Sequence, residues 1–133
     1  MIFSKKNEKR VFDLNKSLKF DNELELNIYV RKLMNNSAEK DIRLEIAIES
    51  LLRSLIYYVY SCEPEGKQTL NQVLEEIEKS VNTDENEDDF ISKIDTFPID
   101  HPARIYWREV SSLTQEELKE VFKKSSDIIN ASI

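Results

Sequence analysis

The sequence has only one glycine, one cysteine and one histidine in 133 residues. A Walker A phosphate loop and the dinucleotide-binding fingerprint each need more than one glycine, so the single Gly66 excludes both motifs. Cys62 has no second cysteine with which to form an internal disulfide or a cysteine zinc site. A lone His101 likewise excludes a paired-histidine metal site. We therefore expect the chain to hold no cofactor and no metal ion.

Long apolar runs and a secretory leader pattern are also missing. A membrane-spanning helix needs about 20 consecutive, mostly apolar residues, and a secretory leader needs a basic start followed by an apolar stretch. We therefore expect a cytoplasmic protein. The unpaired Cys62 agrees with a reducing compartment.

Turn-forming residues are scarce, since only three prolines accompany the single glycine. Because tight turns between strands depend on such residues, the composition favours long helices over sheets. Hydrophobic residues make up 40% of the chain, which is enough for a core, and 34% of the residues are charged. We predict an all-α fold, a compact multi-helix bundle in one domain over residues 11–133, after a flexible basic tail over residues 1–10.

The helical pattern is strongest over residues 38–62. A wide stripe of leucine, isoleucine and valine covers one side of this segment, and a second apolar patch that includes Ile42 and Ile46 covers much of the other. A helix that is apolar around most of its circumference belongs at the centre of a bundle. We therefore predict a long central apolar helix here, which Pro64 and Gly66 end.

Capping residues mark the starts of the other helices. We expect Leu24, Ile28 and Leu33 on one face of the first helix, and Ile105, Tyr106 and Val110 facing inward on a later one. A short helix should stop before Pro98, and residues 11–15 form a possible short strand that lacks a clear partner. The expected helix caps are Asn22, Thr69, Asp100 and Thr114.

Charge is distributed unevenly along the chain, whose net charge is −7. Residues 1–20 hold six bases against two acids, whereas residues 63–100 hold twelve acids against three bases. An acidic surface repels a phosphate backbone and suits basic proteins, so we expect direct nucleic-acid binding to be weak or absent. The acids expected to bind a basic partner are Glu63, Glu65, Asp84, Glu85, Glu87, Asp88 and Asp89.

Simpler interpretations of three features stay open. The acidic run at 84–89 is also typical of a solvated loop, and it lacks the central glycine of an EF-hand calcium loop. His101 precedes a proline at an expected helix start, which favours a structural histidine over a general base. Trp107 fits either an interface anchor or a core residue.

Four segments follow one another in an order that resembles a known domain. They are VFDLN (11–15), ESLLRSLIYYVY (49–60), TLNQVLEEI (69–77) and HPARIYW (101–107). In this order they resemble the all-α domain that is inserted into the ATPase domain of type IV secretion coupling proteins, the TraG/TraD-like conjugation ATPases. The residues that follow the family pattern are Glu49, Leu52, Leu55, Ile56, Tyr58, Thr69, Leu70, Val73, Leu74, His101, Pro102, Ala103 and Tyr106 or Trp107.

The resemblance implies a non-catalytic substrate-recognition domain. In such coupling proteins this domain faces the cytosol at the base of a membrane-anchored ring and receives the relaxase, its accessory proteins and the attached DNA strand. The ATPase motifs are missing from this chain, so the resemblance implies that the chain is one domain of a larger coupling protein, the parent protein. Membrane attachment would then belong to the parent protein, which would form oligomers through its ATPase domain. Two other functions remain open, namely a free-standing cytosolic helical adaptor of a mobile element and a small enzyme that uses His101 with nearby carboxylates.

Overall fold

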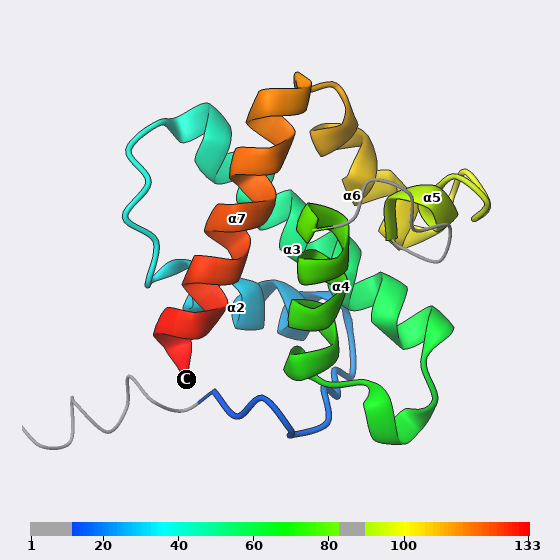
Figure 1. The fold of residues 1–133 in the computed structure, drawn as a ribbon. Coiled ribbons are helices and arrows are strands. Elements are labelled where there is room, and N and C mark those ends of the chain that lie inside the picture. The colour runs from blue at the N-terminus through cyan, green and yellow to red at the C-terminus, as the bar shows by residue number, and fades with distance from the viewer. Residues whose placement is uncertain (1–11, 83–89) are drawn as a thin grey trace, which may run out of the picture.

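The computed structural model describes residues 12–82 and 90–133, and every regular element in these two ranges is a helix (Figure 1). The all-α prediction is therefore confirmed for the described residues, whose helices pack as a compact bundle. The elements are α2 (Glu23–Met34), α3 (Ile42–Cys62), the 3-10 helix η1 (Glu65–Lys67), α4 (Leu70–Asn82), α5 (Phe90–Ile94), α6 (Pro102–Ser111) and α7 (Gln115–Ser132).

The prediction of a possible strand at residues 11–15 is wrong for residues 12–15, which contain a turn. Residue 11 lies outside the described residues. The Asp13 carboxylate accepts the backbone N–H of Asn15 at 2.9 Å, and the Asp13 carbonyl accepts that of Lys16 at 3.3 Å. An aspartate that bonds to the backbone two residues ahead favours a turn over an extended strand. The expected tail at residues 1–10 also lies outside the described residues.

The longest helix in the described ranges, α3, begins at Ile42 and not at residue 38. In the preceding linker, the Ser37 hydroxyl accepts the N–H of Glu39, and the Glu39 carboxylate accepts those of Lys40 and Asp41. Such local bonds between side chain and backbone compete with helix formation. Asp41 then caps α3, because its carboxylate accepts the N–H of Arg43 at 2.9 Å.

Helix α3 carries eleven buried residues and contacts α2, α4, α5, α6 and α7. Leu51, Leu52 and Leu55 have no exposed surface. Two buried serines are also present on α3, and the Ser54 hydroxyl donates a 2.6 Å hydrogen bond to the carbonyl of Ala103 at the start of α6. The helix therefore joins its neighbours through apolar contacts and, at this point, through a side-chain bond to the backbone.

Ile42 and Ile46, which belong to the second apolar patch expected on α3, are 72% and 54% exposed, so that side of the helix start does not pack in the core. Three further apolar side chains that were expected on one face of α2 or on the inner face of α6 are exposed as well. Leu24 is 66% exposed, Ile28 47% and Ile105 44%. Of the three residues expected on one face of α2, only Leu33 is buried, and it shares a helical stripe with Leu26, Val30 and Met34. Because α2 carries apolar residues in two phases, periodicity alone did not identify the side that packs against the core.

The last helix, α7, lies against α3 and α4 and also contacts α2 (Figure 1). It begins with the predicted capping box, in which Thr114 and Glu117 each bond to the other's backbone N–H at 3.2 Å. Its buried side includes Val121, Phe122 and Ile129.

None of the helices in residues 12–82 and 90–133 is both long enough and apolar enough to span a membrane.

Replacing Leu55 with alanine should lower the free energy of unfolding by about 2–5 kcal/mol, because a fully buried leucine leaves a cavity when it is shortened. Urea denaturation followed by circular dichroism measures this loss. Ile46→Ala is the matched control on the same helix, since Ile46 is 54% exposed, and it should change the free energy by less than about 1 kcal/mol. Similar losses for the two variants would contradict the assigned core.

Candidate functional site

The predicted partner-binding acids Glu63 and Glu65 lie in the connection between α3 and α4. Glu63 caps the C-terminus of α3, where its N–H donates to the carbonyl of Val59 at 3.0 Å, and its side chain is partly exposed. Glu65 begins η1, and its exposed carboxylate lies 4.0 Å from the Lys19 ammonium. The other predicted acids lie outside the described residues: Asp84, Glu85, Glu87, Asp88 and Asp89.

Helix α4 adds carboxylates next to this connection. Glu75 and Glu78 are exposed, whereas Glu76 is only 4% exposed. The Gln72 amide donates to Glu76 Oε2 at 3.3 Å, and the Lys79 ammonium lies 3.7 Å from the same oxygen. Glu76 Oε1 is buried and has no hydrogen-bond partner among the described residues. One buried carboxylate oxygen is therefore left unsatisfied, which is rare in folded proteins.

Burial raises the pKa of Glu76 above the usual range of a glutamate, although Lys79 and Gln72 partly oppose this shift. Glu76 is not among the acids expected to bind a partner. The signal was present, because Glu76 lies three residues after Val73 and beside Ile77 on the apolar side of α4.

Tyr58 and Cys62 lie near Glu76 at the C-terminal end of α3. Tyr58 is buried and Cys62 is exposed, and desolvation is the main cause of a raised pKa for both groups. A thiol with a raised pKa stays protonated at neutral pH and is a poor nucleophile. The raised pKa therefore disfavours the thiolate that nucleophilic catalysis by Cys62 would need.

His101 caps α6, in the place predicted for Asp100. Its Nδ1 accepts the N–H of Ala103 at 3.1 Å, and its Nε2 lies 2.9 Å from the Ser61 hydroxyl. An Nδ1 that accepts a hydrogen bond carries no proton, so the neutral ring carries its proton on Nε2 and donates it to Ser61. A general base for Ser61 would need the opposite arrangement. The geometry assigns a capping role to His101.

Most of the remaining residues of the family pattern lie where one helix packs against another. Glu49 pairs with Arg53 and, at 3.3 Å, with Arg31 of α2. Tyr106 stacks on Tyr57 with 6.0 Å between ring centroids, and burial together with a hydrogen bond to Glu23 raises the pKa of Tyr106 to about 12. Pro102 is exposed, and the buried residues of the pattern are Leu52, Leu55, Ile56, Tyr58, Thr69, Leu70, Val73, Leu74, Ala103 and Trp107.

Trp107 is only 6% exposed, and its ring contacts Phe90 edge-on with 5.2 Å between centroids. Of the two interpretations that the sequence left open, the structure favours the core residue over the interface anchor.

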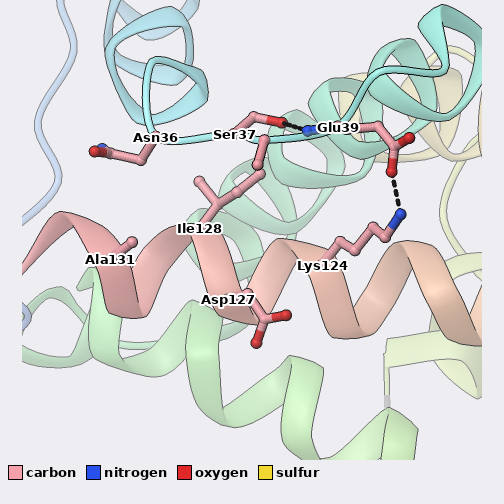
Figure 2. A pocket seen from close by; sticks show the side chains of 8 residues that line it. Asn36, Ser37, Glu39, Lys124, Asp127, Ile128 and Ala131 are labelled. Carbon is pink, nitrogen blue, oxygen red and sulfur yellow. Dashed lines mark hydrogen bonds and ion pairs between the residues drawn. The ribbon is translucent and has the colours of Figure 1, made fainter.

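A surface groove of about 400 Å³ lies between the linker that precedes α3 and the C-terminal half of α7 (Figure 2). Across it, the Glu39 carboxylate pairs with the Lys124 ammonium, and this hydrogen bond lowers the pKa of Glu39. The Asn36 amide donates to the Ser132 hydroxyl at 2.8 Å. The charged groups of the groove are largely paired with each other, and Asp127 is the exposed exception.

Within the described residues, no three His, Cys, Asp or Glu side chains are grouped so as to hold a metal ion. Comparison with known proteins found no matching family model, no matching curated protein and no matching solved structure.

Replacing Glu76 with glutamine should stabilise the protein at pH 8 by on the order of 1 kcal/mol, because the buried carboxylate is then charged and one of its oxygens is unsatisfied. The folded state raises the pKa of Glu76, so wild-type stability falls as pH rises from the unfolded-state pKa to the folded-state pKa. The advantage of Glu76→Gln should therefore shrink toward pH 4. Urea denaturation at several pH values measures it.

Glu75→Gln is the matched control, because Glu75 is exposed on the same helix. It should change stability little and without this pH dependence. A benefit of Glu76→Gln that grows as the pH falls would refute the assigned desolvation.

Replacing His101 with alanine should destabilise the protein by about 1 kcal/mol, because the cap of α6 is lost. His101→Asn should recover most of this loss, since asparagine is a good cap. Thermal unfolding measures both variants. If the asparagine variant is as unstable as the alanine variant, the capping role is wrong.

Proposed function

We propose that this chain is a non-catalytic helical docking domain that binds basic partner proteins. The proposed biological setting is conjugative DNA transfer, with the chain acting as the substrate-recognition domain of a type IV coupling protein. Its proposed partners are the relaxase and its accessory proteins. Two observations support the proposal, namely the all-helical fold and the order of the four sequence segments that resemble that domain.

The proposal takes α3 as the central helix of the domain. In support, α3 contacts α2, α4, α5, α6 and α7, and it carries eleven of the buried residues. In the proposed parent protein the domain lies at the cytosolic face of the membrane. Membrane attachment and ring formation are then supplied by the other parts of that protein.

The observation that carries the docking proposal is a set of carboxylates that face solvent between the end of α3 and the middle of α4. Glu65, Glu75 and Glu78 are exposed, and Glu63 is partly exposed. Exposed charges steer association more than they add affinity, and salt screens them. A basic partner would therefore bind faster and more tightly at low ionic strength.

A free-standing adaptor of a mobile element would use the same carboxylates, so binding experiments do not separate it from a coupling-protein domain. The DNA sequence on either side of the coding region separates these two functions. A reading frame that continues into a phosphate-binding loop favours the coupling protein, and one with no such flanking motif favours the adaptor. The proposed absence of catalysis agrees with the donor role of His101 Nε2 toward Ser61.

The double variant Glu63→Lys/Glu65→Lys should bind a basic relaxase or accessory protein about tenfold more weakly at 50 mM salt, which corresponds to about 1.4 kcal/mol. The reason is that two attractive charges become repulsive. The measurement is biolayer interferometry with the purified relaxase and accessory proteins encoded beside the chain. The difference between variant and wild type should shrink at 300 mM salt.

Glu109→Lys/Glu116→Lys is the matched control, because it makes the same change in net charge at exposed positions of α6 and α7. It should weaken binding less than the first double variant. Equal weakening by both would mean that net charge alone matters. No binding of any of these proteins to the wild type would remove the proposed function.

A further inference from the structure

A second groove, of about 240 Å³, lies between residues 12–20 and the outer side of α2. Its chemistry is opposite to that of the carboxylates on η1 and α4. Three lysines and three aromatic rings line it, together with a single carboxylate. The residues that matter for its chemistry are Phe12, Asp13, Lys16, Lys19, Phe20, Tyr29 and Lys32.

The wall formed by residues 12–20 is fixed by hydrogen bonds to the start of α4 and to α3. The N–H of Leu18 donates to the carbonyl of Gln68 at 2.8 Å, and the N–H of Asn71 donates to the carbonyl of Leu14 at 2.9 Å. The Tyr60 hydroxyl accepts the N–H of Phe20 and donates to the carbonyl of Leu18. The groove is therefore preformed, and a ligand would not have to order this wall.

The aromatic rings form one edge-to-face cluster. Phe12 and Phe20 each contact Tyr29 with 5.2 Å between ring centroids. Burial raises the pKa of Tyr29, so its hydroxyl keeps its proton at neutral pH. This hydroxyl makes no hydrogen bond to the described residues. The groove thus combines a partly exposed apolar surface with a neutral donor that is available to a ligand.

The three lysines are exposed and have almost no counter-ions among the described residues. Lys19 has Glu65 at 4.0 Å, which is the limit of an ion pair. Lys16 and Lys32 have no ion-pair partner in residues 12–82 and 90–133. Asp13 is the one acid in the lining, and one of its oxygens already accepts the N–H of Asn15. Like charges around one groove repel each other, and an anionic ligand relieves that repulsion.

We propose that this groove binds an acidic segment of a partner protein, which places one aromatic or aliphatic side chain on the Phe12, Phe20 and Tyr29 rings and carboxylates beside Lys16, Lys19 and Lys32. The Tyr29 hydroxyl donates to a carboxylate of that segment. This contact goes beyond the proposed function, which concerns basic partners and the carboxylates of Glu63 and Glu65.

A peptide fits the groove better than a polynucleotide does. About 240 Å³ holds one large side chain, whereas pockets for small molecules and cofactors run from about 300 to 1,000 Å³. A polynucleotide would also extend past the three lysines over a protein with net charge −7. Charges beyond about 8–10 Å are screened at physiological salt, so a short acidic segment feels mainly the lysines.

The test uses a fluorescein-labelled peptide with the sequence Glu-Glu-Phe-Glu-Glu, flanked by glycine and serine, and the full chain. Fluorescence anisotropy gives the Kd at 50 and 300 mM salt. The variant Lys16→Gln/Lys32→Gln should raise the Kd about tenfold at 50 mM salt, and its matched control Lys119→Gln/Lys123→Gln, at exposed lysines of α7, should change it less than twofold. The amide resonance of Tyr29 should shift on binding in an NMR titration.

Two further peptides separate the contribution of the carboxylates from that of the aromatic side chain. A peptide with glutamine in place of glutamate, and one with alanine in place of phenylalanine, should each bind more weakly than the parent peptide. Failure of the wild type to bind the parent peptide would overturn the proposal. So would equal losses in the two lysine variants, or tighter binding of a ten-nucleotide deoxythymidine strand than of the peptide.

Discussion

The structure depends on the burial of the apolar side chains of α3. In the described residues the core is one connected cluster, and α3 contributes more buried side chains to it than any other helix. Burial of apolar surface is worth roughly 25 cal/mol per Å², so an element that contacts five others influences all of them. Ser54, a polar residue within this core, is satisfied by its bond to the carbonyl of Ala103 on α6, whereas buried Glu76 keeps one unsatisfied oxygen. The exposed positions of the other helices do not contribute to this core, so they can carry the charged side chains that a docking surface needs.

Carboxylates in this protein occupy two contrasting environments. Glu39 and Glu117 accept hydrogen bonds from Lys124 and Arg43, and these bonds lower the pKa of both acids. Glu76 is buried beside α3 with one unsatisfied oxygen, and its pKa is raised. The first two hold the linker before α3 and the start of α3 against α7, whereas Glu76 costs stability wherever it is charged. A costly buried acid is a common sign of a constraint other than stability.

The helical class and the starts of α2 and α7 could be predicted from the sequence, since Asn22 caps α2 and Thr114 and Glu117 form the expected box. Such signals are local, and they involve residues three positions apart. The cap of α6 is His101 and not the predicted Asp100. The buried side of α2 could not be predicted, because Leu24 and Leu26 belong to two competing stripes and tertiary contacts decide between them. The hydrophobic pattern predicts a start of α3 at residue 38, four residues too early, because it does not reflect the side-chain bonds of Ser37 and Glu39 to the backbone. Of the candidate acids, Glu63 and Glu65 lie within the described residues. The burial of Glu76 and the groove beside Tyr29 could not be predicted, because both arise from contacts between segments that are distant in the sequence.

The attachment of α7 to the beginning of the bundle has a consequence for protein synthesis. Ser132 bonds to Asn36, Lys124 pairs with Glu39, and Glu117 pairs with Arg43, so α7 makes contacts along its length with residues 36–43. A nascent polypeptide that has left the ribosome only as far as α6 lacks Val121, Phe122 and Ile129, and the apolar sides of α3 and α4 then remain open to water. Chaperone capture and aggregation compete with folding during that interval. The domain therefore reaches its stable state only after translation has passed its last helix.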